Sequence, residues 1–368
     1  MISSRFNVSL IMGDGIGIDV AESAQQVVDA ALNKSTSLAV NWQNVHAGAG
    51  YFSETGMDIE SGAEHAMEKS DAIFLGAIGL PAVRQPDGTE ISPHLRLREI
   101  YELYAGVRPV KAYPNVPQRL SDSRAMNIDM VILRESTEGL FYSASVHNRS
   151  DIRGDNEVRE TMLVTRRITE KLHDFGFRLA EKRKARGGMG KITCVDKANV
   201  FAAMAFFRKI FDERSTAFPD VEKHYNYVDA QALDLVRKPW EYDVLVMENM
   251  FGDILSDLAG GLVGGMGMAA CAEIGDEHGL FQPAHGSAPD IMGKDLANPL
   301  AAILSGALML DYLADKSDEE SVADAAMLID QAVDAGFQQN RLRPAEFGGD
   351  MGTNAVTREV LSLIDEAC

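Results

Sequence analysis

Two aspartates one helical turn apart are the strongest chemical signal in this sequence. Asp253 and Asp257 lie in the run Asn249-Met250-Phe251-Gly252-Asp253-Ile254-Leu255-Ser256-Asp257. On a helix, positions i and i+4 differ by about 400°, so both carboxylates project from nearly the same side and can share one hard cation. The spacing predicts a divalent-metal site, although two such acids are also common on a solvated helix surface.

Three arginines near the ends of expected elements offer the complementary charge. Arg98 and Arg108 flank the run 100–104, and Arg134 follows the apolar run 130–133. Because arginine binds carboxylates through paired hydrogen bonds, the three side chains together suit a small polycarboxylate. Each of them taken alone is more often a surface residue.

A lysine and a third aspartate also follow expected strands. Lys197 stands just after the strand-like run 191–195, and Asp229 follows the strand-like run 225–228. A lysine placed beside a metal can have its pKa depressed and act as an acid or base. For either residue alone, a surface charge at a strand end is the alternative.

Two glycine-bearing segments are candidates for binding a cofactor. The run Gly13-Asp14-Gly15-Ile16-Gly17 follows a strand, but a dinucleotide fingerprint needs Gly or Ala where Ile18 stands, and no acid follows near residues 39–42. It therefore predicts a tight turn and no Rossmann phosphate loop. Residues 282–291 read as an irregular loop that lets a ligand approach the backbone, in which Asp290 could accept ribose hydroxyls.

These side chains are positioned by alternating strands and helices. We expect strands at 8–12, 72–76, 130–133, 191–195, 225–228 and 244–247, and helices from 17 to about 33 and at 158–184, 199–213, 298–314 and 319–335. Alternation of this kind predicts an α/β sheet, in which ligands bind at the carboxyl ends of the strands.

Bulk properties narrow the function classes. A chain of 368 residues favours two domains, and its net charge of −20 argues against nucleic acid. The cysteines Cys194, Cys271 and Cys368 are far apart, which favours a reducing, cytoplasmic setting. The sequence has neither a secretory n-region nor 18 uninterrupted apolar residues, so we expect no secretion and no membrane insertion.

Together the motifs resemble the metal-dependent, NAD(P)-linked β-decarboxylating dehydrogenases that act on isopropylmalate, isocitrate, homoisocitrate, tartrate or D-malate. The strongest motifs are Asp196-Lys197-Ala198-Asn199, the run 249–257, and His285-Gly286-Ser287-Ala288-Pro289-Asp290 with Ala297-Asn298-Pro299. The resemblance implies the two-domain α/β/α fold of isopropylmalate and isocitrate dehydrogenases, which is not a Rossmann fold. Residues 1–103 plus 265–368 would form a large cofactor-binding domain, and residues 104–264 a smaller domain for substrate, metal and dimerisation.

The resemblance also implies roles for individual residues. Arg98, Arg108 and Arg134 would hold the malate-like core of a small polycarboxylate. Asp253 and Asp257 would bind Mg²⁺ or Mn²⁺ together with Asp229 from a second subunit, which would also donate the catalytic Lys197 in a homodimer with shared active sites. The cofactor would lie on His285, Gly286, Ser287, Ala288, Asp290 and Asn298. Since Asp290 stands where NADP-dependent relatives carry a basic residue, the cofactor is predicted to be NAD.

Two departures bear on chemistry and substrate. The family carries a proton-donating tyrosine seven residues after its third arginine, where this chain has Phe141 followed by Tyr142. Tyr142, Lys197 or water would supply the proton, or the decarboxylation would be slow. Ser92 and His94 stand where isocitrate enzymes grip the extra carboxylate, which favours a polar or anionic substituent over isopropyl, unless His94 merely faces solvent.

The resemblance therefore predicts NAD-dependent oxidation of a 3-substituted (2R)-malate, followed by metal-assisted loss of CO₂. A non-catalytic regulatory subunit, or a dehydrogenase with weak decarboxylation, is the alternative. The particular malate, the pathway and the oligomeric state beyond a dimer are left open by the sequence.

Overall fold

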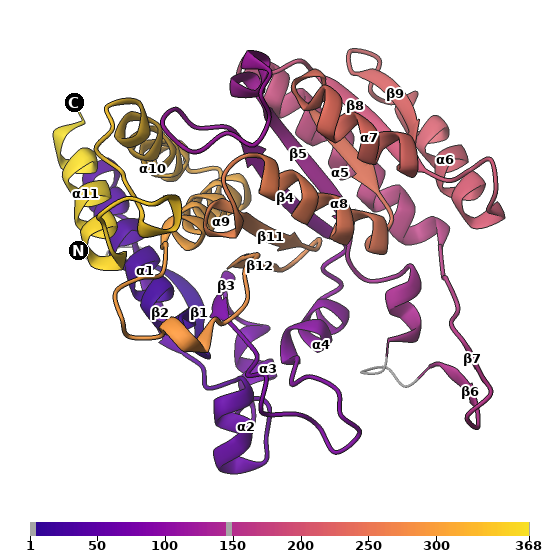
Figure 1. Cartoon of the computed structure of the whole chain (residues 1–368), viewed down its shortest axis with the longest axis horizontal. Helices are drawn as coiled ribbons and strands as arrows, with labels where there is room; N and C mark the ends of the chain where they lie inside the picture. The colour runs from indigo at the N-terminus through magenta and orange to yellow at the C-terminus, as the bar shows by residue number, and fades with distance from the viewer. Residues whose placement is uncertain (1–4, 145–148, 368) are drawn as a thin grey trace.

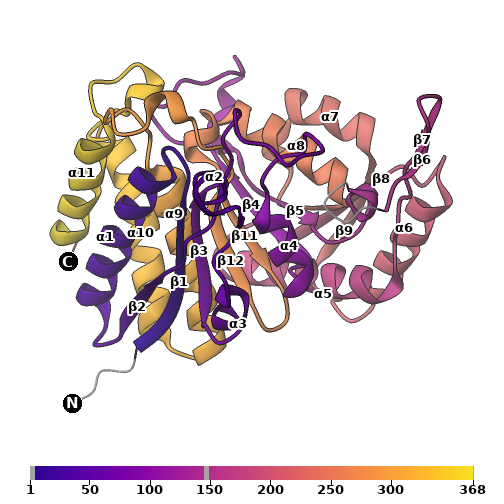
Figure 2. The ribbon, with the colours of Figure 1, turned by 90° about the horizontal axis from the view of Figure 1, so that it is seen from below.

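The computed structural model describes residues 5–144 and 149–367, which are built around one ten-stranded sheet (Figure 1). The strands follow the order β2-β1-β3-β12-β11-β4-β5-β10-β8-β9. Their bounds are β1 Arg5–Gly13, β2 Ala39–Asn44, β3 Ala72–Ala77, β4 Ala105–Lys111, β5 Asp129–Glu135, β8 Lys191–Asp196, β9 Glu222–Tyr227, β10 Val244–Met247, β11 Ala270–Ile274 and β12 Gly279–Pro283. A separate ribbon of β6 Asp151–Arg153 and β7 Glu157–Arg159 projects from the body (Figure 2).

The sheet is parallel in both outer parts and antiparallel at its centre. Strand β4 runs antiparallel to both β5 and β11, and β11 runs antiparallel to β12. The late strands β11 and β12 therefore lie between β3 and β4, which are close in sequence. Strands β3 and β10 are buried along their whole length, as expected for strands covered by helices on both faces.

Helices cover both parts of the sheet. Around β1 to β3 pack α1 Gly17–Ser35, α9 Leu300–Ser317, α10 Glu320–Gln338 and α11 Thr353–Glu366, at the left of Figure 1. The other part carries α5 Arg166–Ala185, α6 Ala202–Ser215, α7 Val228–Arg237 and α8 Asn249–Leu262. The short helices α2 Ala49–Thr55, α3 Ala63–Met67 and α4 Pro93–Ile100 lie below the sheet in Figure 1.

One hydrophobic core joins the two parts of the sheet. It runs from Val8 and Phe74 through Phe281 to Phe177 and Val246. The domain boundaries at residues 103 and 265 stay a prediction, because this core is shared. No helix in the described part of the chain is long and apolar enough to cross a membrane. Cys194 and Cys271 are buried free thiols, and Cys368 lies outside the described residues.

The expected α/β alternation is confirmed, although the bounds of several elements differ. The strand predicted at 225–228 is β9, which ends at Tyr227, and Val228 begins α7. The helix predicted to begin at Val158 begins at Arg166, because Val158 belongs to β7 and the Thr165 hydroxyl accepts the Ile168 N–H at 3.4 Å as an N-cap. The run 282–291, predicted as an irregular loop throughout, begins as the end of β12, which pairs with β11, and closes in a 3₁₀ turn at Pro289–Ile291.

Candidate active site

The two predicted metal ligands lie on the solvent-facing side of α8. This helix starts directly after β10, with the Glu248 carboxylate accepting the Phe251 N–H at 3.2 Å as its N-cap. The Asp253 and Asp257 side chains are 44% and 62% exposed, whereas Leu255 packs into the core. Partial burial raises the pKa of Asp257 above its ordinary value, and the charge of Arg108 opposes that shift.

The predicted arginines gather against this aspartate pair from β4 and β5. The Arg108 guanidinium lies 3.7 Å from a carboxylate oxygen of Asp253 and 3.7 Å from one of Asp257. Arg134 contacts Asp253 through Nη1, and its Nε and Nη2 donate to the Asn249 side-chain oxygen at 2.9 and 2.7 Å. Burial and the neighbouring arginines lower the pKa of Arg134 to about 10. The arginines and the aspartates therefore form one cluster.

The third arginine is engaged by a carboxylate that sequence reasoning missed. Glu273 of β11 is fully buried, and its Oε1 lies 2.7 Å from Nη2 of Arg98. Burial alone would raise the pKa of Glu273, but Arg98, Arg108 and Arg134 outweigh that effect and hold it below its ordinary value. The available signal was a single acid within the apolar run 270–274, just before Gly275.

The two residues expected to read the substrate's substituent lie at the start of α4. Ser92 is the residue before the first turn, and His94 lies within that turn. Nδ1 of His94 is buried without a hydrogen-bond partner. Burial, followed by the charge of Arg98, lowers the pKa of His94 to about 3, so its ring is neutral at physiological pH. His94 therefore offers hydrogen bonding but no positive charge.

Phe141 and Tyr142 face different neighbours. The Phe141 ring lies 4.9 Å from the Arg134 guanidinium, and it lines a small cavity together with Arg98. The Tyr142 ring instead packs under the Arg149 guanidinium at 4.5 Å. Phenylalanine thus stands beside the arginine cluster, and Tyr142 would have to move to donate a proton there.

Lys197 and Asp229 pair with each other. The Lys197 ammonium contacts the Asp229 carboxylate and lowers its pKa, and Asp229 is 69% exposed in the first turn of α7. In the described part of the chain, no group of three acidic, histidine or cysteine side chains could hold a metal. Asp229 therefore does not join Asp253 and Asp257 within one chain, which leaves its expected role dependent on a second subunit.

The predicted cofactor loop rests on the glycine-rich turn. The Ile16 N–H donates to the Ser287 carbonyl at 2.7 Å, and the Ser287 hydroxyl contacts the Gly79 carbonyl. At Gly15, whose φ is +57°, a Cβ would lie 2.0 Å from the Ser287 oxygen. Glycine is therefore needed there for close approach to the loop, in place of the phosphate contact that the failed fingerprint would make.

The cofactor candidates themselves differ in exposure. Nε2 of His285 is buried without a hydrogen-bond partner, and burial lowers the pKa of its ring. Asp290 is exposed, as are Gly286 and Ala288. The Asn298 amide donates to Glu346 at 2.9 Å. Glu346 was missed by sequence reasoning because it lies 48 residues further along the chain.

The donor set matches the expected ligands. Asp253 and Asp257 offer carboxylate oxygens, which Mg²⁺ and Mn²⁺ prefer, and both side chains are partly exposed. Buried arginines beside them suit carboxylate groups. The chemistry of this cluster is therefore compatible with a metal-bound polycarboxylate.

Comparison with known proteins identifies the protein family. Residues 7–364 match the family model for isocitrate/isopropylmalate dehydrogenase. The chain is 38% identical to the 3-isopropylmalate/3-methylmalate dehydrogenase of Methanocaldococcus jannaschii, over 98% of this chain and 99% of that protein. It resembles the solved isocitrate dehydrogenase of Methylococcus capsulatus with a TM-score of 0.82 and 31% identity, over 98% of this chain and 100% of that one. For a β-decarboxylating dehydrogenase from Thermococcus kodakarensis, the TM-score is 0.78 at 34% identity, over 98% and 96% of the two chains.

The chain belongs to the isocitrate/isopropylmalate dehydrogenase family. It is therefore an oxidoreductase of the decarboxylating dehydrogenase type, with the fold that the sequence motifs predicted.

Proposed function

We propose that the protein catalyses the NAD-dependent oxidation of a 3-substituted (2R)-malate and the loss of its β-carboxylate as CO₂, with Mg²⁺ or Mn²⁺. The observation that carries this proposal is the single cluster in which Arg108 and Arg134 meet Asp253 and Asp257. This cluster supports the proposal because the aspartates would bind the cation that holds the substrate's hydroxyl, and the arginines beside them would bind its carboxylates.

The residues divide into binding and proton-transfer roles. When bound, the cation would polarise the substrate's C2 hydroxyl and carboxylate, and NAD would accept the hydride from C2. Arg98, Arg108 and Arg134 orient the malate core. A base acting through Lys197 removes the C2 hydroxyl proton, and the donor to C3 is Tyr142, Lys197 or water.

The cofactor proposal rests on the loop 285–290 with Asn298. The unpartnered, buried Nε2 of His285 is a hydrogen-bonding group that a ligand in the loop can satisfy. The exposed carboxylate of Asp290 would accept a ribose 2′-hydroxyl and repel a 2′-phosphate. We therefore propose NAD over NADP.

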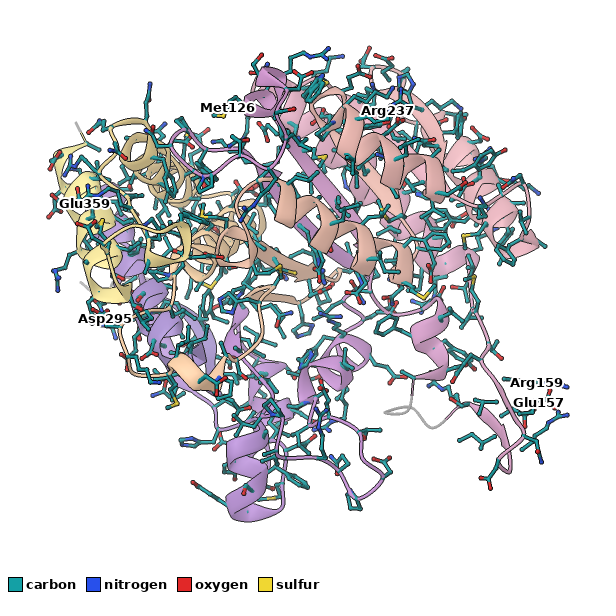
Figure 3. The ribbon with its side chains drawn as sticks, in the orientation of Figure 1. Met126, Glu157, Arg159, Arg237, Asp295 and Glu359 are labelled. Atoms are coloured by element: carbon teal, nitrogen blue, oxygen red, sulfur yellow. The ribbon has the colours of Figure 1, made fainter. Side chains whose placement is uncertain are left out.

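We propose a homodimer in which Lys197 and Asp229 complete the partner's active site, with residues 104–264 as the dimerising domain. Exposed apolar side chains on neighbouring α7 and α8 support this interface, namely Leu233, Val236 and Ile254. The β6–β7 ribbon, marked by Glu157 and Arg159 in Figure 3, offers a second surface because it reaches away from the body. The buried free thiols of Cys194 and Cys271 support a reducing, cytoplasmic setting.

We propose the class of substrate, a 3-substituted malate, and no single compound within it. Curated relatives bear the names 3-isopropylmalate dehydrogenase and 3-isopropylmalate/3-methylmalate dehydrogenase, and a structural relative is an isocitrate dehydrogenase. These names keep several 3-substituted malates as candidates. Ser92 and His94 at the start of α4 offer polar groups near Arg98.

The decisive experiment measures NADH formation and CO₂ release by the purified chain with Mn²⁺, NAD and a panel of malate derivatives. We expect Asp253→Asn to abolish Mn²⁺-dependent turnover, because it removes one of two carboxylates from the cation site. The matched control is Asp324→Asn, the same change at an exposed position of α10. If no malate in the panel supports NADH formation, the proposal is contradicted and a non-catalytic regulatory subunit is favoured. NADH formation without CO₂ release would indicate weak decarboxylation.

A further inference from the structure

A cross-strand row of three residues underlies the arginine cluster. Arg134 of β5 lies opposite Gly106 of β4, and Gly106 lies opposite Glu273 of β11. Residues in such a row project to one face of a sheet. A Cβ at Gly106 would lie 3.0 Å from Oε2 of Glu273 and 2.7 Å from the Ser136 hydroxyl. The missing side chain therefore gives the Glu273 carboxylate its space among the arginines.

Glu273 places a permanent negative charge in that space. Its side chain is fully buried, pairs with Arg98 at 2.7 Å and is held ionised by all three arginines, which keep its pKa low. Cys271, two residues earlier on the same strand, adds no charge because burial and Glu273 raise its pKa to about 11. His94 is neutral as well, since its pKa is lowered to about 3.

The charges balance for a dicarboxylate. Three arginines carry three positive charges and Glu273 carries one negative charge, which leaves two positive charges for the two carboxylates of a malate core. The aspartates of α8 would be matched by the divalent cation of the proposed function. A third substrate carboxylate would therefore find no unmatched positive charge in this cluster.

The cavity beside Arg98 also lacks an unmatched positive charge. Its walls are Leu95, Arg98, Glu99, Ser136, Thr137, Phe141 and Ala144. Among these described residues Arg98 alone is a cation, and it is engaged by Glu273. Glu99 adds a second carboxylate, which pairs with Arg149 at 2.9 Å. The charges of Arg98 and Glu99 are therefore both matched, by Glu273 and by Arg149. A cavity without an unmatched positive charge accepts a small uncharged group and disfavours an anion, because a buried unpaired charge is costly.

We propose that Glu273 is a specificity-determining residue, which restricts the site to malates with a small uncharged substituent at C3 and excludes tricarboxylates of the isocitrate type. The inference rests on the proposed function, in that the C3 substituent enters the cavity beside Arg98. It departs from the sequence expectation from Ser92 and His94, which favoured a polar or anionic substituent over isopropyl, because it rejects an anionic substituent and admits an apolar one.

The test is Glu273→Gln, which keeps the shape and an acceptor for Arg98 but removes the charge. We measure kcat/KM for 3-methylmalate and for isocitrate with NAD and Mn²⁺. The wild type should prefer 3-methylmalate, and the variant should raise the ratio of isocitrate to 3-methylmalate by about tenfold or more. An unchanged ratio, or a wild type that prefers isocitrate, would overturn the proposal; the wild-type measurement holds even if the variant folds poorly.

The matched control is Asp243→Asn. Asp243 is likewise buried and paired with an arginine, Arg183, but it precedes β10 and lies at the opposite end of that strand from α8. This control should leave the substrate ratio unchanged. A shift equal to that of Glu273→Gln would mean that any loss of a buried carboxylate alters selectivity, and it would overturn the assignment.

A binding measurement separates this inference from the proposed function. Calorimetric titration with tricarballylate and with methylsuccinate needs no turnover. Glu273→Gln should tighten tricarballylate binding about tenfold relative to methylsuccinate. If the wild type oxidises no malate, the proposed function fails while this titration still tests Glu273. Equal changes for the two ligands would contradict its role.

Discussion

Gly15→Ala should damage cofactor binding through a contact between two loops. The new Cβ would lie 2.0 Å from the Ser287 carbonyl oxygen, where contacts under 3.0 Å are not tolerated, so the loop or the turn must move by at least 1.0 Å, the difference. That movement breaks the 2.7 Å hydrogen bond from Ile16 to Ser287. The left-handed backbone costs alanine about 1 kcal/mol and the lost bond about 1 kcal/mol, so the free energy of unfolding should fall by about 2 kcal/mol.

The loop 285–290, which Gly15→Ala displaces, is the proposed binding site of NAD. The dissociation constant of NAD should therefore rise by about tenfold or more. Calorimetric titration with NAD and urea denaturation measure the two effects. The matched control is Gly56→Ala, at a glycine with φ +76° where no atom lies within 4 Å of the new Cβ. That control should cost about 1 kcal/mol and leave NAD binding intact. Equal NAD affinity in the two variants would refute the proposed contact between turn and cofactor loop.

Three further predictions concern other residues. Phe141→Tyr should raise CO₂ release relative to NADH formation, because it restores a donor beside Arg134, and full activity of Tyr142→Phe would exclude Tyr142 as the donor. Asp290→Arg should raise the ratio of kcat/KM for NADP to that for NAD by about tenfold, and a wild type that prefers NADP would contradict the reasoning. Burial raises the pKa of Glu135 from 4.5 to about 7, so the folded state retains a proton that the unfolded state loses, and the free energy of unfolding should fall as pH rises through that window. Glu135→Gln should flatten this slope in urea denaturation, and a slope that persists would show that other groups cause it.

Much of the site could be predicted because its chemistry is local in sequence. Asp253 and Asp257 share one helix, and Arg98, Arg134 and Lys197 stand at or near the ends of helices and strands, so short motifs carry their placement. Arg108, which was also expected at the end of an element, lies in the middle of β4. The alternation of strands and helices was equally local, since buried parallel strands read as apolar runs. The helix that begins at Arg166 was predicted to begin too early, at Val158, because the apolar residues before the Thr165 cap continue the helical pattern.

Glu273 and Glu346 could not be predicted because their partners are distant in sequence. Glu273 meets Arg98 only when β11 inserts beside β4, and nothing near residue 273 specifies that pairing. Glu346 reaches Asn298 across 48 residues. Burial of a charged residue is a property of the assembled sheet, and a lone glutamate in a short apolar run is compatible with an exposed position.

If the proposed site is right, we expect the contact of Arg134 with Asp253 to make the affinities for cation and substrate interdependent. A cation that coordinates Asp253 competes with Arg134 and so releases a guanidinium for a substrate carboxylate. A substrate that binds Arg134 in turn leaves Asp253 available to the cation. Thermodynamic reciprocity then requires each ligand to strengthen the other by the same factor. We expect the dissociation constant of Mn²⁺ to fall when a dicarboxylate is present, and identical values with and without it would show that the two sites bind independently.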